Sequence, residues 1–251
     1  MTRPFRTTAP YYARYRPAYP PELITRLAEA TGVDRDARVL DLGCGPGTVA
    51  IPFAAYAGEV VAVDREPAMI AELRRAAPPN LVVIEGQAED VDESWGSFRL
   101  ATAGRSFHWF DAPFVLERLT AVTPAVALLG DDSRDSEAQS LTLAIAAELI
   151  DAPSIPRPKF RYEDILRAGP FCDVEVISVE VERTWTPDEL IGMAYSTSAA
   201  SLERIGDRRE EFEARVRAEL EPEYRERVGV DAVLGRLQAT RGRRAGRQPR
   251  P

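Results

Sequence analysis

The sequence has few of the side chains that most metal-dependent, hydrolytic and redox enzymes use. Its 251 residues contain one histidine, one lysine and two cysteines, which are His108, Lys159, Cys44 and Cys172. Two cysteines and one histidine cannot complete a disulfide framework, a structural zinc site or a three-histidine centre. No G-x-S-x-G elbow precedes His108, and a P-loop would lack its lysine. We therefore expect no metal and a chemistry that depends on a bound organic cofactor.

The chain also lacks a long apolar run and an excess of positive charge. No apolar stretch reaches the roughly 18 residues of a membrane span, and residues 1–10 lack the apolar core of a secretion signal. We expect a cytoplasmic protein with no membrane partner. Asp and Glu number 40 against 32 Lys and Arg, and this net charge of −8 disfavours nucleic acid as a partner. A hydrophobic content of 45% is ample for a folded core.

Strand and helix patterns alternate through the first 130 residues. Apolar runs predict strands at 37–42, 59–63, 81–84, 98–103 and 126–129, with helices at 49–54 and 66–77. Such alternation implies parallel pairing in a doubly wound α/β sheet.

The pattern changes after residue 130. It predicts helices at 136–150 and 162–168 and strands at 174–181 and 228–234. Thr186 with Glu189, and Asp207 with Glu210, have the spacing of capping boxes that begin two further helices. We expect the two late strands to pair antiparallel, with the helices of 186–225 inserted between them as a cover. The expected fold is a seven-stranded, mostly parallel, Rossmann-like sheet with an antiparallel last strand.

The whole chain is expected to form one domain with five recognisable parts. These are N-terminal lid helices at 1–36, a cofactor-binding core at 37–130, a helical insertion at 131–170, a helical substrate cover at 186–225 and an Arg-rich tail at 236–251.

A glycine-rich turn follows the first predicted strand. Gly43, Gly45 and Gly47 let the backbone turn tightly and approach a ligand with no Cβ in the way. The dinucleotide fingerprint needs glycine where this chain has Thr48, which argues against NAD or FAD. Asp64 closes the next strand, where a carboxylate can accept both hydroxyls of a ribose. The alternative for Asp64 is a helix-capping or surface role.

The run 39–48, Val-Leu-Asp-Leu-Gly-Cys-Gly-Pro-Gly-Thr, resembles motif I of the class I methyltransferases that use S-adenosylmethionine. Asp64 matches the ribose-binding acid of that family, and the segment 86–90 resembles its adenine segment, with Gln87 where the family has Asp. The resemblance implies S-adenosylmethionine as cofactor and Asp41 as a residue that holds its amino end. The candidate cofactor-binding residues are Arg16, Asp41, Gly43, Cys44, Gly45, Asp64, Arg65, Met69, Gln87, Ala88, Glu89 and Arg105.

The N-terminal segment 11–20 is similar to the Y-x-x-x-R-P-x-Y-P lead of small-molecule methyltransferases in the type 11 and trans-aconitate-like group. In that group the segment folds over the cofactor, which implies that Arg16 reaches the methionine carboxylate. The alternative is a helix lead-in whose tyrosines pack on the domain.

The segment 104–111 follows the fourth predicted strand and resembles the HWFD segment of the same group. Methyl transfer needs an aligned acceptor and removal of its proton, and His108 has a suitable pKa for a general base. Alternatively, His108 orients the loop or the substrate; Asp111 is expected to be a helix N-cap. The candidate substrate-binding residues are Tyr12, Tyr15, His108, Trp109, Trp185, Tyr195 and Ser196. Trp185 and Tyr195 have an alternative role as core residues of the cover.

These features predict an enzyme that methylates O or N of a small molecule. The expected acceptor is a bacterial specialised metabolite, such as one from antibiotic biosynthesis. We expect a monomer or a homodimer. Two alternatives stay open: a nucleic-acid methyltransferase that uses the Arg-rich tail, and a cofactor-binding module without transfer activity.

Overall fold

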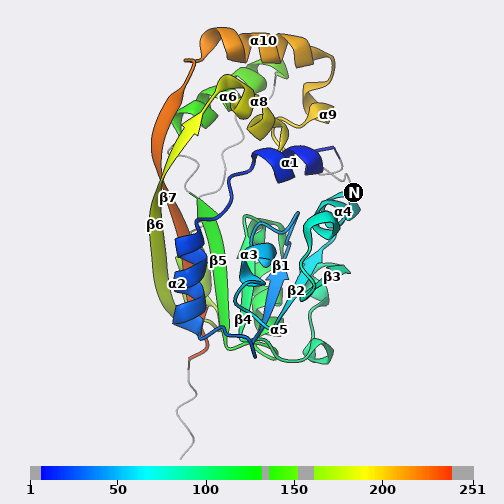
Figure 1. Ribbon diagram of the computed structural model, residues 1–251, viewed down its shortest axis with the longest axis vertical. Coiled ribbons are helices and arrows are strands. Elements are labelled where there is room, and N and C mark those ends of the chain that lie inside the picture. Colours follow the sequence, from blue (N-terminus) through cyan, green and yellow to red (C-terminus); the bar gives the residue numbers. More distant parts are fainter. Residues whose placement is uncertain (1–6, 132–135, 152–160, 239–251) are drawn as a thin grey trace, which may run out of the picture.

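A single seven-stranded sheet organises the chain (Figure 1). The computed structural model describes residues 7–131, 136–151 and 161–238. The strand order is β3-β2-β1-β4-β5-β7-β6, in which the first five strands are parallel and β7 runs antiparallel to both β5 and β6. The predicted fold class and the antiparallel pairing of the two late strands are confirmed. The strands span β1 Arg38–Leu42, β2 Glu59–Asp64, β3 Leu81–Glu85, β4 Leu100–Gly104, β5 Ala125–Asp131, β6 Asp173–Trp185 and β7 Tyr224–Arg236.

Strands β6 and β7 are longer than the sequence pattern indicates. They pair over 13 residues each, from Asp173 opposite Arg236 to Trp185 opposite Tyr224, and extend to the helical cover (Figure 1). Charged residues face one another over the added length, as in the pair Arg183 and Glu226. Opposite charges stabilise such cross-strand pairs, but they remove the apolar alternation that marks a strand in sequence.

Helices cover both faces of the sheet. Leu23, Leu27 and Phe53 belong to the core on one face, whereas Val115 and Leu119 belong to the core on the other face. Every predicted helix has a counterpart, although the one expected at 49–54 is a single turn. The α-helices are α1 Ala9–Tyr15, α2 Pro21–Thr31, α3 Ala50–Phe53, α4 Pro67–Ala76, α5 Ala112–Leu119, α6 Glu137–Leu149, α7 Tyr162–Ala168, α8 Pro187–Tyr195, α9 Leu202–Ile205 and α10 Arg209–Glu219.

A third hydrophobic cluster forms the cover at one end of the sheet. It joins α6, α8 and α10 around Tyr195, Phe212 and Val216. Helix α1 lies between this cover and the sheet and contacts both α8 and α4 (Figure 1). Helix α1 and the cover helices α6, α8 and α10 therefore meet above the carboxyl ends of the central strands. Within the described part of the chain, no helix is long and apolar enough to cross a membrane.

One of the two predicted capping boxes is wrong. Asp207 lies inside a 3-10 turn, Gly206–Arg208, and α10 begins only at Arg209 with no side-chain cap. Gly206 takes a positive φ of 54°, so the chain turns there and the helix starts two residues after Asp207. From position 239 on, the predicted Arg-rich tail lies outside the described residues. Lys159 also lies outside them.

The other predicted capping box is confirmed at the start of α8. The Thr186 N–H and hydroxyl donate to Glu189 Oε2 at 2.9 and 2.8 Å, and the Glu189 N–H donates to Thr186 Oγ1 at 3.3 Å. These bonds fix the angle at which β6 turns into the cover.

Thr186→Ala should lower the free energy of unfolding by about 1 kcal/mol, because it leaves backbone donors of the first turn without their side-chain partner. Thr186→Ser keeps the hydroxyl and is the matched control. Urea unfolding monitored by circular dichroism measures both changes. Equal stability of the alanine and serine variants would contradict this role of the cap.

Candidate active site

The site lies where β1 and β4 end side by side in the centre of the sheet. The chain leaves β1 towards β2 on one side, and β4 continues towards β5 on the other. Such a switch in strand order opens a crevice beyond the carboxyl ends of the strands, which is where doubly wound folds bind ligands. Gly43 follows β1 and Arg105 follows β4 directly, so the two predicted loops meet at this crevice.

The glycine turn adopts backbone angles that favour glycine. Gly43, Gly45 and Gly47 have φ values of 62°, 54° and 94°. A Cβ at Gly43 would lie 2.6 Å from the Cβ of Ser106, whereas a Cβ at Gly45 would meet no atom within 4 Å. Gly43 thus admits the Ser106 loop, and Gly45 leaves an open surface towards the crevice.

Asp64 at the end of β2 holds the turn in place. Its Oδ2 accepts the Gly45 N–H and its Oδ1 accepts the Glu66 N–H, both at 2.8 Å. Burial raises the pKa of Asp64, while these two bonds favour its charged form and limit the rise. Asp64 does not cap α4, whose N-cap is Glu66 and which has no side-chain cap bond. A carboxylate has about four acceptor positions, so Asp64 keeps capacity for further donors.

Asp41 is fully buried at the centre of the sheet. Its Oδ1 accepts the Thr102 hydroxyl of β4 at 2.8 Å, and its Oδ2 has no hydrogen-bond partner among the residues that the structure describes. Burial raises the pKa of Asp41 to about 7, against the opposing effect of the Thr102 bond. A buried acceptor without a donor is costly, so this oxygen is suited to a donor that a ligand brings.

The remaining candidates around the turn differ in exposure. Cys44, Met69 and Ala88 are buried, whereas Arg65 and Gln87 are exposed at the rim. Burial raises the pKa of the Cys44 thiol, so this cysteine stays protonated.

Glu89 and Asp111 connect the predicted adenine segment to the loop after β4. Glu89 Oε1 accepts the Asp111 N–H at 3.0 Å. Asp111 in turn caps α5, since its Oδ1 accepts the Phe114 N–H at 3.3 Å, which confirms the predicted N-cap. Glu89 therefore helps to hold the loop after β4 in place.

Arg105 ties the N-terminal segment to the end of β4. It has a positive φ of 54°, donates from Nη1 to the Pro17 carbonyl at 2.9 Å and lies 4.5 Å from the centre of the Tyr19 ring. The Tyr19 hydroxyl continues the connection by donating to the Leu129 carbonyl at 3.2 Å. The segment that follows α1 is thereby fixed over the ends of β4 and β5.

His108 and Trp109 lie on a 3-10 turn, Phe107–Trp109, three residues farther along the same loop. Phe107 anchors the turn in the core, and the Ser106 hydroxyl donates to the Leu42 carbonyl at 2.9 Å. His108 is exposed and its ring lies 5.0 Å from that of Trp109, which is 52% exposed. The turn is rigidly attached, but its two polar rings face outward from the core.

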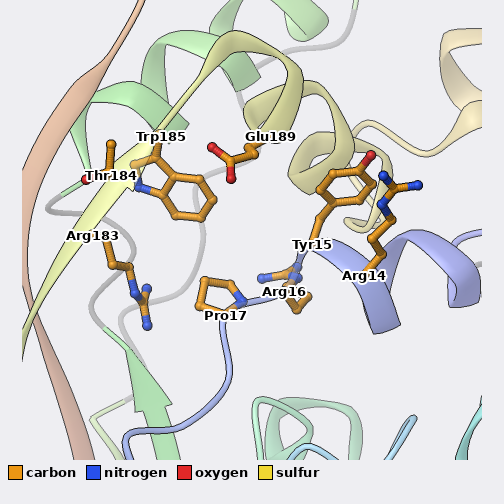
Figure 2. Close-up of a pocket in the computed structure, with 8 residues that line it drawn as sticks. All are labelled: Arg14, Tyr15, Arg16, Pro17, Arg183, Thr184, Trp185 and Glu189. Atoms are coloured by element: carbon orange, nitrogen blue, oxygen red, sulfur yellow. The ribbon is translucent and has the colours of Figure 1, made fainter.

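A pocket of about 250 Å³ lies between α1, β6 and α8 (Figure 2). It brings together three of the predicted residues, Tyr15, Arg16 and Trp185. Figure 2 shows Arg183 and Trp185 extending from β6 towards Arg16 and Pro17. The described lining consists of Arg14, Tyr15, Arg16, Pro17, Arg183, Thr184, Trp185 and Glu189.

Other predicted substrate residues lie elsewhere. Tyr195 and Ser196 are buried in the cover, where the Tyr195 hydroxyl donates to Glu213 at 3.1 Å and the Ser196 hydroxyl donates to the Met193 carbonyl. The placement of Tyr195 fits its alternative role as a core residue of the cover, and Trp185, which is 5% exposed, belongs to the same hydrophobic cluster. The Tyr12 ring lies 5.1 Å from the Arg16 guanidinium.

Comparison with known proteins assigns the class of this fold. Residues 39–125 match the family model described as a methyltransferase domain. Residues 39–125 therefore carry a methyltransferase domain. A protein of Mycobacterium tuberculosis named an uncharacterized methyltransferase is 29% identical over 198 residues, which cover 79% of this chain and 78% of that protein.

Solved structures share the fold of this methyltransferase. A protein from Anaeromyxobacter dehalogenans assigned as a type II methyltransferase is similar with a TM-score of 0.58 and 23% identity, over 88% of this chain and 98% of that one. An S-adenosylmethionine-dependent methyltransferase from Thiobacillus denitrificans, solved with S-adenosylhomocysteine, has a TM-score of 0.53 and 16% identity, over 95% and 99% of the two chains.

The crevice of the methyltransferase fits its cofactor on two independent observations. The space beside Gly45 would be filled by a Cβ, as expected of a surface that a ligand approaches closely. The unpartnered Asp41 Oδ2 is an acceptor suited to an ammonium group, such as the one on the methionine part of the cofactor.

The sequence analysis missed several residues of the site, and three of them have a clear structural role. Thr102 donates to Asp41, Ser106 packs on Gly43, and Arg183 lines the pocket. Of these three, only Arg183 could have been predicted from the sequence. Residues two positions apart on a strand share a face, and Arg183 lies two positions before the predicted substrate residue Trp185.

Wild-type stability should fall as pH rises from 4.5 to 8, and Asp41→Asn should remove much of that fall. Folded Asp41 keeps its proton up to about pH 7, whereas the unfolded chain loses it near pH 4, so the folded state binds more protons between these values. The contribution is on the order of 3 kcal/mol. Urea unfolding at both pH values measures it, with the exposed Asp36→Asn as control. An Asp41→Asn profile parallel to the wild type would contradict the raised pKa.

Proposed function

We propose that this methyltransferase transfers the methyl group of S-adenosylmethionine to O or N of a small-molecule acceptor. The observation that carries the proposal is the pocket of about 250 Å³, which has the scale of a compact ligand. Its border residue Pro17 is bonded to Arg105, at the end of β4 beside the glycine turn. The acceptor pocket and the cofactor crevice are thus neighbours along one continuous set of contacts.

The residues of the crevice support distinct parts of the cofactor in this proposal. Asp64 accepts the ribose hydroxyls with its remaining acceptor positions, and Asp41 Oδ2 accepts from the amino group. Arg16 binds the carboxylate, and Ala88 lies beside the adenine. When bound, S-adenosylmethionine supplies a methyl group that is already activated by its sulfonium. The chain then needs to align the acceptor and to accept its proton.

We assign His108 as the general base that accepts the proton of the acceptor. Its loop is fixed to β1 by the Ser106 bond and to the N-terminal segment by Arg105. The exposed ring can exchange the proton with water after each turnover, and imidazole is the side chain that most often serves as a general base.

Partner and location follow the same proposal. We favour a small molecule over a nucleic acid because the chain has a net charge of −8. The acceptor we expect is a specialised metabolite in a bacterial cytoplasm, and the enzyme is expected to act as a monomer or homodimer.

Gly45→Ala should weaken binding of S-adenosylhomocysteine by at least about tenfold, since its Cβ enters the space assigned to the ligand. Gly32→Ala is the matched control, because Gly32 also has a positive φ, 65°, and open space around its Cβ, but lies at the end of α2. Isothermal titration calorimetry measures both affinities. Unchanged affinity in Gly45→Ala, or no binding to the wild type, would refute the cofactor assignment.

His108→Gln should lower kcat by about 10²-fold or more, because general-base catalysis contributes on that scale. Affinity for S-adenosylhomocysteine should stay within about twofold of wild type. Formation of S-adenosylhomocysteine with a panel of hydroxyl and amine acceptors measures the rate, and Trp109→Phe serves to separate proton transfer from loop packing. A loss of less than about threefold would leave His108 with an orienting role only.

A further inference from the structure

We propose that the aromatic ring of Phe110 recognises the sulfonium of S-adenosylmethionine, so that the enzyme binds this substrate in preference to its product, S-adenosylhomocysteine. This inference rests on the proposed function, since it adds a specificity-determining residue to the same methyltransferase. Three features of Phe110 carry it: the support of its ring, its contact with the glycine turn, and its place between that turn and the proposed base.

The ring of Phe110 has a defined position on the loop after β4. Phe110 ends the 3-10 turn in an extended conformation, and its N–H donates to the Phe107 carbonyl at 3.2 Å. Its ring meets the buried Phe107 ring almost edge-on, with 5.6 Å between the centres and an interplanar angle of 74°. The next residue, Asp111, is bonded to Glu89 at 3.0 Å. Contacts on both sides along the chain therefore fix where the ring lies.

The tip of the Phe110 ring reaches the glycine turn after β1. A Cβ at Gly43 would lie 3.0 Å from Phe110 Cζ and 2.6 Å from the Cβ of Ser106. Glycine at this position thus leaves room for both side chains of the neighbouring loop. Phe110 spans the distance between the loop after β4 and the turn after β1, which are the two loops that meet at the cofactor crevice.

The roles assigned in the proposed function imply that the sulfur of the cofactor lies near this ring. Asp64 is assigned to the ribose and Asp41 to the amino group. The sulfur joins these two parts of the molecule, so it belongs along the turn between them. Its methyl group has to face the loop of His108 for transfer. Phe110 belongs to the loop of His108 and contacts the turn at Gly43, so it meets both conditions.

An aromatic ring at this place distinguishes the substrate from the product by charge. The sulfonium of S-adenosylmethionine is a cation, whereas the sulfur of S-adenosylhomocysteine is a neutral thioether. The face of an aromatic ring attracts cations, ligand cations included, and does so more strongly where water is excluded. Phe110 packs on the core next to Phe107 but stays partly exposed, so part of its ring is open to a ligand. Contact with this ring favours the substrate and eases release of the product.

Binding of the two cofactor forms to Phe110→Leu tests this inference, because leucine keeps an apolar side chain without an aromatic face. Isothermal titration calorimetry in the absence of an acceptor measures both affinities. We expect S-adenosylmethionine to bind about five- to tenfold more weakly than to the wild type, with S-adenosylhomocysteine within about twofold. Phe114→Leu is the matched control and should change neither affinity. Phe114 is 47% exposed on α5, and its ring centre lies 5.1 Å from the Arg118 guanidinium.

A fluorinated ring separates recognition of charge from packing. Replacement of Phe110 by 3,5-difluorophenylalanine keeps the shape of the ring and weakens its attraction for a cation. We expect this variant to bind S-adenosylmethionine about two- to threefold more weakly and S-adenosylhomocysteine as the wild type does.

Two results would overturn the inference: equal losses of affinity for both ligands in the two Phe110 variants, or an unchanged affinity for S-adenosylmethionine. Equal losses would show that the ring packs against a part that both ligands share. Absence of S-adenosylhomocysteine binding to the wild type would instead refute the cofactor assignment of the proposed function, so the two failures are distinct.

Discussion

The hydrogen bond from Thr102 to Asp41 joins the two central strands of the sheet at the level where both end. It keeps a carboxyl group fully buried between β1 and β4, and burial in turn raises the pKa of that group to about 7. A neutral acid in the core would be a poor choice for stability alone. Its Oδ2 has no hydrogen-bond partner among the described residues, and we assign this oxygen to a donor of the cofactor. In this proposal the centre of the sheet combines a structural bond with a binding group.

Loops near this centre are fixed by contacts that cross between strands. Asp64 of β2 holds the Gly45 turn, and Arg105 after β4 holds Pro17 from the N-terminus. Since both loops are attached to rigid strands, the cofactor crevice and the pocket keep a defined separation. Such preorganisation is what an in-line transfer needs, because the protein contributes chiefly by alignment.

Sequence patterns predicted the core of this arrangement because it depends on local rules. Strand periodicity, the glycine turn and the Thr186 cap each act over a few residues. The Asp207 cap failed because the turn at Gly206 displaced the helix start, which spacing alone does not reveal. Thr102 could not be assigned at all, since its role comes only from strand pairing. The parts of the site therefore come together only through the sheet order, which pairs β1 with β4 and brings β6 to the edge beyond β5 and β7.

Net charge and local charge point in opposite directions in this protein. The −8 balance describes the whole surface and argues against phosphate backbones as partners. The pocket, in contrast, gathers Arg14, Arg16 and Arg183 next to a buried tryptophan. Total charge acts on large partners that meet the whole surface. The side chains that line a partly buried space decide instead which small molecule fits there, because Coulomb interactions are less screened in such a space.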